Sequence, residues 1–81
     1  MVERLAWTRQ AWNDYQYWQK QDRKTLRRIN QLILATLRDP YSGIGKPEAL
    51  KGDLSGFYSR RIDHVNRLVY EVDERVITIL S

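Results

Sequence analysis

Apolar residues recur at helical spacing in the first half of the chain. Trp12, Tyr15 and Trp18 return at every third position, which predicts an aromatic stripe along a first helix, Arg9 to Lys20. Thr8 precedes this helix and is a candidate N-cap, because its hydroxyl can accept a hydrogen bond from the first helical turn.

A second amphipathic helix is predicted from Asp22, its candidate N-cap, to Arg38. Its apolar positions fall at i, i+3, i+7 and i+11, namely Leu26, Ile29, Ile33 and Leu37. Proline disfavours helical geometry in the residue before it, so Asp39-Pro40 ends this helix. The break near Gln21-Asp22 predicts that the two helices form a hairpin.

Short runs of β-branched and aromatic residues predict four strands around the helices. These strands are Leu5 to Trp7, Phe57 to Ile62, Asn66 to Val72 and Arg75 to Leu80. The glycines and both prolines lie in a predicted long ordered loop, Pro40 to Gly56. A loop of this length inside a small domain is typical of a functional segment. A length of 81 residues favours one domain, residues 1–81.

Strand alternation brings two arginines together. Ile62 points opposite to Arg61, and Leu68 opposite to Arg67. If the apolar pair faces the helices, Arg61 and Arg67 share the open face of the sheet. Their strands are predicted to pair as a hairpin, so the guanidinium groups can lie side by side. Such a pair is unfavourable without an anion between the charges, which indicates an anion site.

Composition excludes several classes of function. The chain has no cysteine, which excludes a disulfide framework, a thiolate nucleophile and a sulfur-ligated metal site. No apolar run approaches the length of about 20 residues that spans a bilayer, and the first residues lack the apolar core of a signal peptide. We therefore expect a cytoplasmic protein that does not bind membranes, and we expect neither a cofactor nor a metal.

Charge is unevenly distributed along the chain. Fourteen Lys and Arg against ten Asp and Glu give a net charge of +4. The second helix carries five cations: Arg23, Lys24, Arg27, Arg28 and Arg38. Two interpretations stay open: this helix contacts ribosomal RNA, or its cations only solvate its outer face.

Three sequence blocks resemble a known family. They are Gly45 to Lys51 (GKPEALK), Leu54 to Ile62 (LSGFYSRRI) and Arg67 to Tyr70 (RLVY). Together with Trp12 to Trp18 (WNDYQYW) and Arg28 to Ile33 (RINQLI), they resemble the YoeB/Txe branch of RelE-like toxins over almost the whole chain. This family consists of ribosome-dependent messenger RNA endonucleases of toxin–antitoxin pairs.

The resemblance implies a RelE-like fold of the α+β class, in the order β-α-α-β-β-β. In that fold an antiparallel sheet carries the two-helix hairpin on one face and the RNA site on the other. The family's general base matches Glu48, and its transition-state arginine matches Arg67. Family basic residues around the scissile phosphate match Lys46, Lys51 and Arg61.

The family's catalytic acid has no match in this sequence. Family members end with a short tail that carries a histidine and a terminal tyrosine, and this sequence stops at Ser81. A shortened chain, an omitted tail and a member without the tail are the three explanations that stay open. Without the tail we expect a weak enzyme.

The candidate residues suit metal-independent RNA cleavage. Attack by the RNA 2′-hydroxyl needs a base, cations around the phosphorus and an acid for the departing 5′-oxygen. Glu48 is the candidate base, and the alternative is a solvated loop carboxylate. Arg61 and Arg67 suit the phosphate oxygens, and the alternative is an ion pair with Glu71 or Asp73.

The signals for the roles of the aromatic residues and the histidine are less specific. Tyr58 lies near the predicted site and is a candidate RNA contact. His64, the single histidine, is interpreted as a solvated turn residue. The aromatic stripe can stack on bases, but in a domain this small it is better explained as core or as a homodimer or antitoxin surface.

The resemblance also implies partners. They are a cognate antitoxin of the YefM/Axe type, the ribosome with its mRNA, and operator DNA when the toxin is bound to its antitoxin. A homodimer is a further candidate assembly. The alternative function is that of a non-catalytic relative, either a ParE-like toxin with another target or an antitoxin-dependent DNA-binding corepressor.

Overall fold

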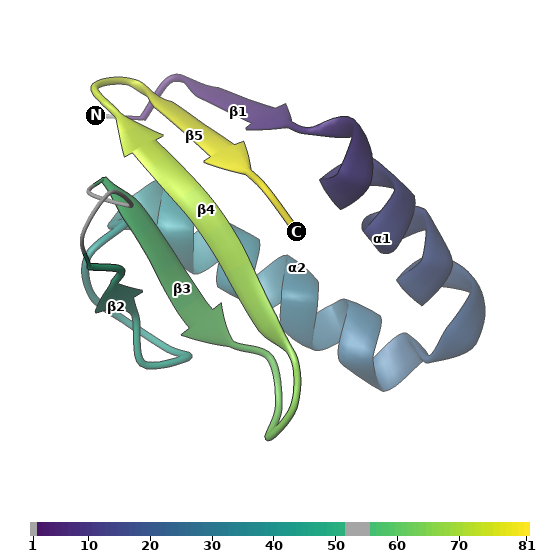
Figure 1. The fold of residues 1–81 in the computed structure, drawn as a ribbon. Helices are drawn as coiled ribbons and strands as arrows, with labels where there is room; N and C mark the ends of the chain where they lie inside the picture. The colour runs from purple at the N-terminus through teal and green to yellow at the C-terminus, as the bar shows by residue number, and fades with distance from the viewer. Residues whose placement is uncertain (1, 52–55) are drawn as a thin grey trace.

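The computed structural model describes residues 2–51 and 56–81, in which two helices lie against five strands (Figure 1). In chain order the elements are β1 (Arg4–Trp7), α1 (Arg9–Gln21), α2 (Arg23–Arg38), β2 (Glu48–Ala49), β3 (Phe57–Arg61), β4 (Arg67–Asp73) and β5 (Val76–Ile79). The predicted helices and the four predicted strands are confirmed, with ends that differ by one or two residues. Residues 52–55, part of the predicted loop and of the block from Leu54 to Ile62, lie outside the described residues.

Both predicted helix caps are present. The Thr8 hydroxyl accepts a hydrogen bond of 3.0 Å from the N–H of Ala11. The Asp22 carboxylate accepts one of 3.0 Å from the N–H of Lys24 and one of 2.7 Å from the Thr25 hydroxyl. Asp22 also ends α1, because its own N–H donates to the carbonyl of Trp18. One residue therefore closes the first helix and opens the second, which sets the hairpin.

The sheet is mixed, in the order β1-β5-β4-β3-β2. The α+β class with two helices and a sheet is confirmed, but the expectation of a wholly antiparallel sheet is wrong at one edge. β1 pairs with β5 in parallel, with Arg4 opposite Val76 and Trp7 opposite Ile79. The helical hairpin between β1 and the rest of the sheet supplies the long crossover that a parallel pair requires. Figure 1 shows the first and last strands side by side.

The core lies between the sheet and the helices. α2 runs behind the sheet in Figure 1. Leu32 of α2, Leu68 and Tyr70 of β4 and Ile77 of β5 are 0% to 3% exposed. Full burial of one such side chain stabilises the fold by about 1.5–3 kcal/mol. The same burial identifies the helix-facing side of each strand, and alternation then assigns the neighbouring residues to the open face.

β2 is the strand that the sequence did not predict, because two residues are too short to show an alternating pattern. It extends the sheet edge beside β3, with Glu48 opposite Ser59. The approach to β2 needs Gly45, whose φ is +83° and where a Cβ would lie 2.6 Å from a methyl carbon of Leu32. Lys46 follows with φ of 50°, a conformation that non-glycine residues seldom adopt. Within the ranges 2–51 and 56–81, neither helix is long and apolar enough to cross a membrane.

Candidate active site

Three predicted site residues meet on the open face of the sheet. In the β3–β4 ladder Arg61 lies directly opposite Arg67, which confirms the predicted pairing of the two arginines. Glu48 lies opposite Ser59, and Ser59 is two residues before Arg61 on the same face of β3. The short strand β2 therefore brings the carboxylate next to the arginine pair.

Glu48 contacts both guanidinium groups at the limit of an ion pair. Its Oε2 lies 3.7 Å from Nη1 of Arg67, and its Oε1 lies 4.0 Å from Nη2 of Arg61. These distances exceed those of hydrogen bonds. The three side chains are 44% to 53% exposed, and exposed pairs of this kind contribute about 0–1 kcal/mol each. The cluster is therefore a weak source of stability and keeps donors and acceptors available to a ligand.

The buried hydroxyl of Ser59 is a hydrogen-bond acceptor for Arg67. Nη1 of Arg67 lies 3.4 Å from the hydroxyl of Ser59, and Ser59 is 2% exposed. The alternative partners considered for Arg67, Glu71 and Asp73, form no ion pair with it in the described part of the chain. The nearest carboxylate to Arg67 is instead that of Glu48, the other residue that was assigned a catalytic role.

The two predicted lysines flank this cluster along the chain. Lys46 follows Gly45, whose carbonyl accepts a 2.6 Å hydrogen bond from the N–H of Arg61. The backbone of Lys46 is therefore held near one end of β3. Lys51 follows Leu50, whose N–H donates to the carbonyl of Phe57 at the other end of β3. Over residues 2–51 and 56–81, no ion pair links either lysine to Glu48.

Tyr58 is not brought together with these residues. It lies opposite Tyr70 in the ladder, on the side of the sheet that faces the helices. Its ring stacks on Tyr70 at 5.9 Å between centroids and meets Tyr41 edge-on at 5.2 Å. The signal that could have indicated this is strand alternation, since Tyr58 and Arg61 differ by an odd number of positions.

Arg60 has a structural role that the sequence did not reveal. It is 0% exposed and holds the loop after α2 through its guanidinium group. Nη2 donates to the carbonyls of Asp39 at 2.7 Å and Ser42 at 2.9 Å, and Nη1 donates to that of Ile44 at 2.9 Å. These bonds fasten the segment that leads to Glu48. Alternation with Arg61 could have placed Arg60 on the helix-facing side.

Tyr70 completes this buried network. Its hydroxyl accepts a hydrogen bond of 3.1 Å from Nε of Arg60 and donates one of 2.6 Å to the carbonyl of Pro40. Burial raises the pKa of the Tyr70 phenol, and the adjacent Arg60 opposes that shift. At neutral pH the phenol therefore keeps the proton that it donates to the loop.

Exposed aspartates shape the turns near the site. Hydrogen bonds from the N–H of Tyr41 and then the hydroxyl of Ser42 lower the pKa of the Asp39 carboxyl. The N–H and the side-chain amide of Asn66, followed by the N–H of Val65, lower the pKa of Asp63 in the β3–β4 turn. Both carboxylates thus order a turn as anions. Among the described residues, no group of three or more His, Asp or Glu side chains could hold a metal ion.

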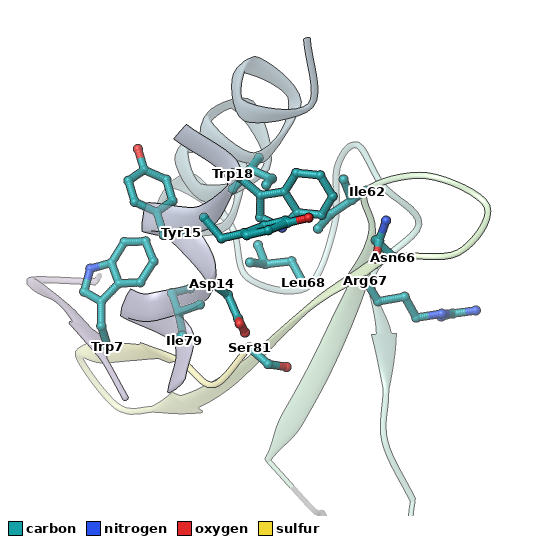
Figure 2. A pocket seen from close by; sticks show the side chains of 13 residues that line it. Trp7, Asp14, Tyr15, Trp18, Ile62, Asn66, Arg67, Leu68, Ile79 and Ser81 are labelled. Atoms are coloured by element: carbon teal, nitrogen blue, oxygen red, sulfur yellow. The ribbon is translucent and has the colours of Figure 1, made fainter. Parts of the chain in front are cut away.

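An apolar groove of about 350 Å³ lies between α1 and the start of β4. Figure 2 shows Trp7 and Tyr15 at one end of it and Arg67 at the other, with the arginine side chain extending away from the rings. Tyr15 and Trp18 pack against the buried core. The interpretation of the aromatic stripe as core is therefore confirmed for these two residues, whereas Trp12 is 46% exposed.

The architecture is that of the RelE-like toxins: a helical hairpin on one face of a small mixed sheet, with an acid and two arginines on the other. A YoeB/ParE toxin from Agrobacterium tumefaciens superimposes with a TM-score of 0.91 at 40% identity, over 98% of this chain and 94% of that chain. The fold and the comparison together define the class of protein.

The sequence model of one family, described as YoeB-like toxin of bacterial type II toxin-antitoxin system, matches residues 7–81. A toxin YoeB of Streptomyces coelicolor is 51% identical over 77 residues, which cover 94% of this chain and 92% of the relative. The chain belongs to the family of YoeB-like toxins of bacterial type II toxin–antitoxin systems.

A solved complex contains a similar chain with its antitoxin. This is the heterotetrameric YoeB-YefM toxin–antitoxin complex from Staphylococcus aureus. The matched chain is 45% identical, with a TM-score of 0.88 over 100% of this chain and 93% of that chain. The resemblance seen in the sequence is thus confirmed at the level of family and fold.

Proposed function

We propose that this toxin inhibits translation by cutting messenger RNA on the ribosome, with Glu48 as general base and Arg67 stabilising the transition state. The observation that carries the proposal is the position of the Glu48 carboxylate, 3.7 Å from Arg67 and 4.0 Å from Arg61 on an open sheet face. A carboxylate beside two phosphate-binding forks supplies the base and the cations that the reaction needs.

The chemical step starts at the RNA 2′-hydroxyl. Glu48 takes the hydroxyl proton while the 2′-oxygen attacks the neighbouring phosphorus. The bond from phosphorus to the 5′-oxygen breaks, and that oxygen takes a proton from water or from a lysine such as Lys51. The products are a 2′,3′-cyclic phosphate and a 5′-hydroxyl. Arg67 and Arg61 donate to the phosphoryl oxygens as negative charge builds on them.

The remaining predicted contacts follow from their positions. Lys46 and Lys51 lie along the chain on either side of Glu48 and are proposed to bind the RNA backbone. Tyr58 faces the helices, so the proposal gives it no contact with RNA. The proposed partners are a YefM-like antitoxin that covers the open face, the ribosome with its mRNA, and operator DNA through the toxin–antitoxin complex. A homodimer of the toxin stays a prediction.

The test is Glu48→Gln, with primer extension on an mRNA under translation in a reconstituted system. General-base catalysis contributes on the order of 10²- to 10⁴-fold, and we expect cleavage to fall by that factor. The matched control is Glu71→Gln. It removes a carboxylate of β4 that lies on the same face of the sheet as Arg67, and this variant should cleave normally. Undiminished cleavage by Glu48→Gln would remove Glu48 from the mechanism.

The same experiment separates the alternative function. A ParE-like toxin or a corepressor leaves the message intact when wild-type protein is added. Blocked DNA gyrase would then identify the first alternative, and an operator shifted in a gel only when antitoxin is present would identify the second. Cleavage within the translated codons by the wild-type protein excludes both as the primary activity.

A further inference from the structure

A second groove lies at the end of the β3–β4 hairpin, beside the candidate active site. It has a volume of about 480 Å³ and is lined by Arg28, Arg61, Ile62, Asp63, His64 and Arg67. We refer to this set of residues as the hairpin groove. Arg61 and Arg67 also belong to the cluster around Glu48. The groove and the candidate active site therefore share two guanidinium groups.

α2 reaches the hairpin groove through Arg28. Its Nη2 donates a hydrogen bond of 3.2 Å to the backbone carbonyl of Arg61. This contact holds the guanidinium group of Arg28 against the end of β3. Arginine carries five N–H donors, and the described part of the chain gives Arg28 this one hydrogen bond. The group therefore retains donors for a ligand.

The charges of the hairpin groove do not balance. Three guanidinium groups face one carboxylate, that of Asp63. Asp63 is engaged within its own turn, where it accepts from the N–H groups of Val65 at 2.8 Å and Asn66 at 2.7 Å. Over residues 2–51 and 56–81, Asp63 forms no ion pair with an arginine. Glu48 contacts Arg61 and Arg67 from outside the groove, and with its charge counted one cation is still in excess. This excess calls for an anion from outside the chain.

We propose that the hairpin groove binds a second backbone phosphate of the RNA, next to the phosphate that is cut. The inference rests on the proposed function, because it concerns the same substrate. Single-stranded RNA carries one phosphate per nucleotide, so a strand that crosses Arg61 and Arg67 places neighbouring phosphates in the cluster and in the groove. Arg28 donates charge-assisted hydrogen bonds to this phosphate, and His64 donates a ring N–H. The contact sets which linkage lies beside Glu48.

The test uses short RNA analogues that cannot be cut because every nucleotide is 2′-deoxy. One trinucleotide has two charged linkages, and in two others one linkage is a neutral methylphosphonate. Wild-type protein should bind the fully charged probe about tenfold more tightly than the probe neutralised at the second phosphate, as one charge-assisted contact predicts. Arg28→Gln combined with His64→Gln should remove this tenfold preference, and the dependence of log affinity on log salt should weaken by about one phosphate contact.

Two controls make the result specific. Arg38→Gln removes an exposed arginine ten positions along α2, about 15 Å away, and should keep the preference. Arg28→Lys retains charge without the planar fork and should recover part of the preference.

Because His64 is the only histidine, its imidazole NMR signals are unambiguous. They should shift with the fully charged probe more than with the probe neutralised at the second phosphate.

The outcomes separate this inference from the proposed function. If wild-type protein does not distinguish charged from neutral linkages, or the double variant keeps the preference, the hairpin groove is not a phosphate site. If the preference behaves as expected but Glu48→Gln still cuts mRNA at the wild-type rate, the groove binds phosphate and the catalytic proposal fails. Loss of cleavage in Glu48→Gln together with loss of the phosphate preference in the double variant supports both.

Discussion

Arg60 and Arg61 are consecutive residues of β3, yet strand alternation directs them to opposite faces of the sheet. Arg60 is 0% exposed and donates hydrogen bonds to three loop carbonyls and the Tyr70 hydroxyl. Arg61 is 46% exposed, and its nearest acid lies 4.0 Å away. The Arg60 guanidinium group thus makes four hydrogen bonds on one face. On the other face, the Arg61 guanidinium group makes none with the described residues and only the long ion pair with Glu48.

The difference separates a structural role from a ligand-binding one. A buried guanidinium group is tolerated because its donors are satisfied, and removing it leaves the carbonyls that accepted from it without that partner. An exposed guanidinium group beside another one, as with Arg61 and Arg67, adds little to stability. Its partners are expected to come from outside the chain. Hydrogen-bond accounting therefore distinguishes the two arginines where residue type does not.

The largest effect on stability is expected for Arg60→Met, a change that retains much of the side-chain volume. Loss of the hydrogen bonds to Asp39, Ser42 and Ile44 should lower the free energy of unfolding by about 3 kcal/mol or more. Urea denaturation followed by circular dichroism measures this. Arg60→Met and its parent protein are both produced in the Glu48→Gln background, which the proposed mechanism predicts to be non-toxic.

Arg61→Gln is the matched control for that experiment. Because its side chain is exposed and its ion pair is long, its free energy of unfolding should stay within about 0.5 kcal/mol of the parent protein. Equal losses for Arg60→Met and Arg61→Gln would erase the distinction between the faces. A loss below about 1 kcal/mol for Arg60→Met would mean that water replaces the guanidinium group at the loop carbonyls.

Tyr70→Phe gives an intermediate effect on the same network. The change keeps the ring but removes the hydroxyl that accepts from Arg60 and donates to Pro40. We expect a loss of about 1–3 kcal/mol, the cost of leaving buried groups unpaired. The measurement is again urea denaturation. A variant as stable as the parent protein would show that Arg60 holds the loop without the phenol.

The smallest effect concerns the exposed turn that Arg60 fastens. Asp39 has a pKa below its ordinary value of 3.8, so its charged form stabilises the fold above that pH. This contribution is lost as the pH falls through the lowered pKa. The melting temperature of the wild-type protein should therefore drop more steeply below pH 4 than that of Asp39→Asn. Parallel curves for the two proteins would show that the Asp39 charge does not contribute.

The pattern of the sequence determined much of this protein. Helical spacing, the caps at Thr8 and Asp22 and the stop at Asp39-Pro40 gave both helices, because these signals act within a few residues of each other. Alternation in the predicted hairpin placed Arg61 beside Arg67 on the open face. The family blocks supported the class of fold. Local physics was sufficient for the helices and for the arginine pair, whereas the class of fold also rested on the family resemblance.

Only the tertiary structure decided how distant segments meet. The parallel pairing of β1 with β5, the short strand that brings Glu48 to the arginines and the burial of Arg60 join residues that are far apart in the chain. The hairpin groove likewise needs α2 to place Arg28 against the end of β3. No local pattern encodes such contacts, because their free energy depends on packing and on which hydrogen-bond acceptors the folded chain brings within reach.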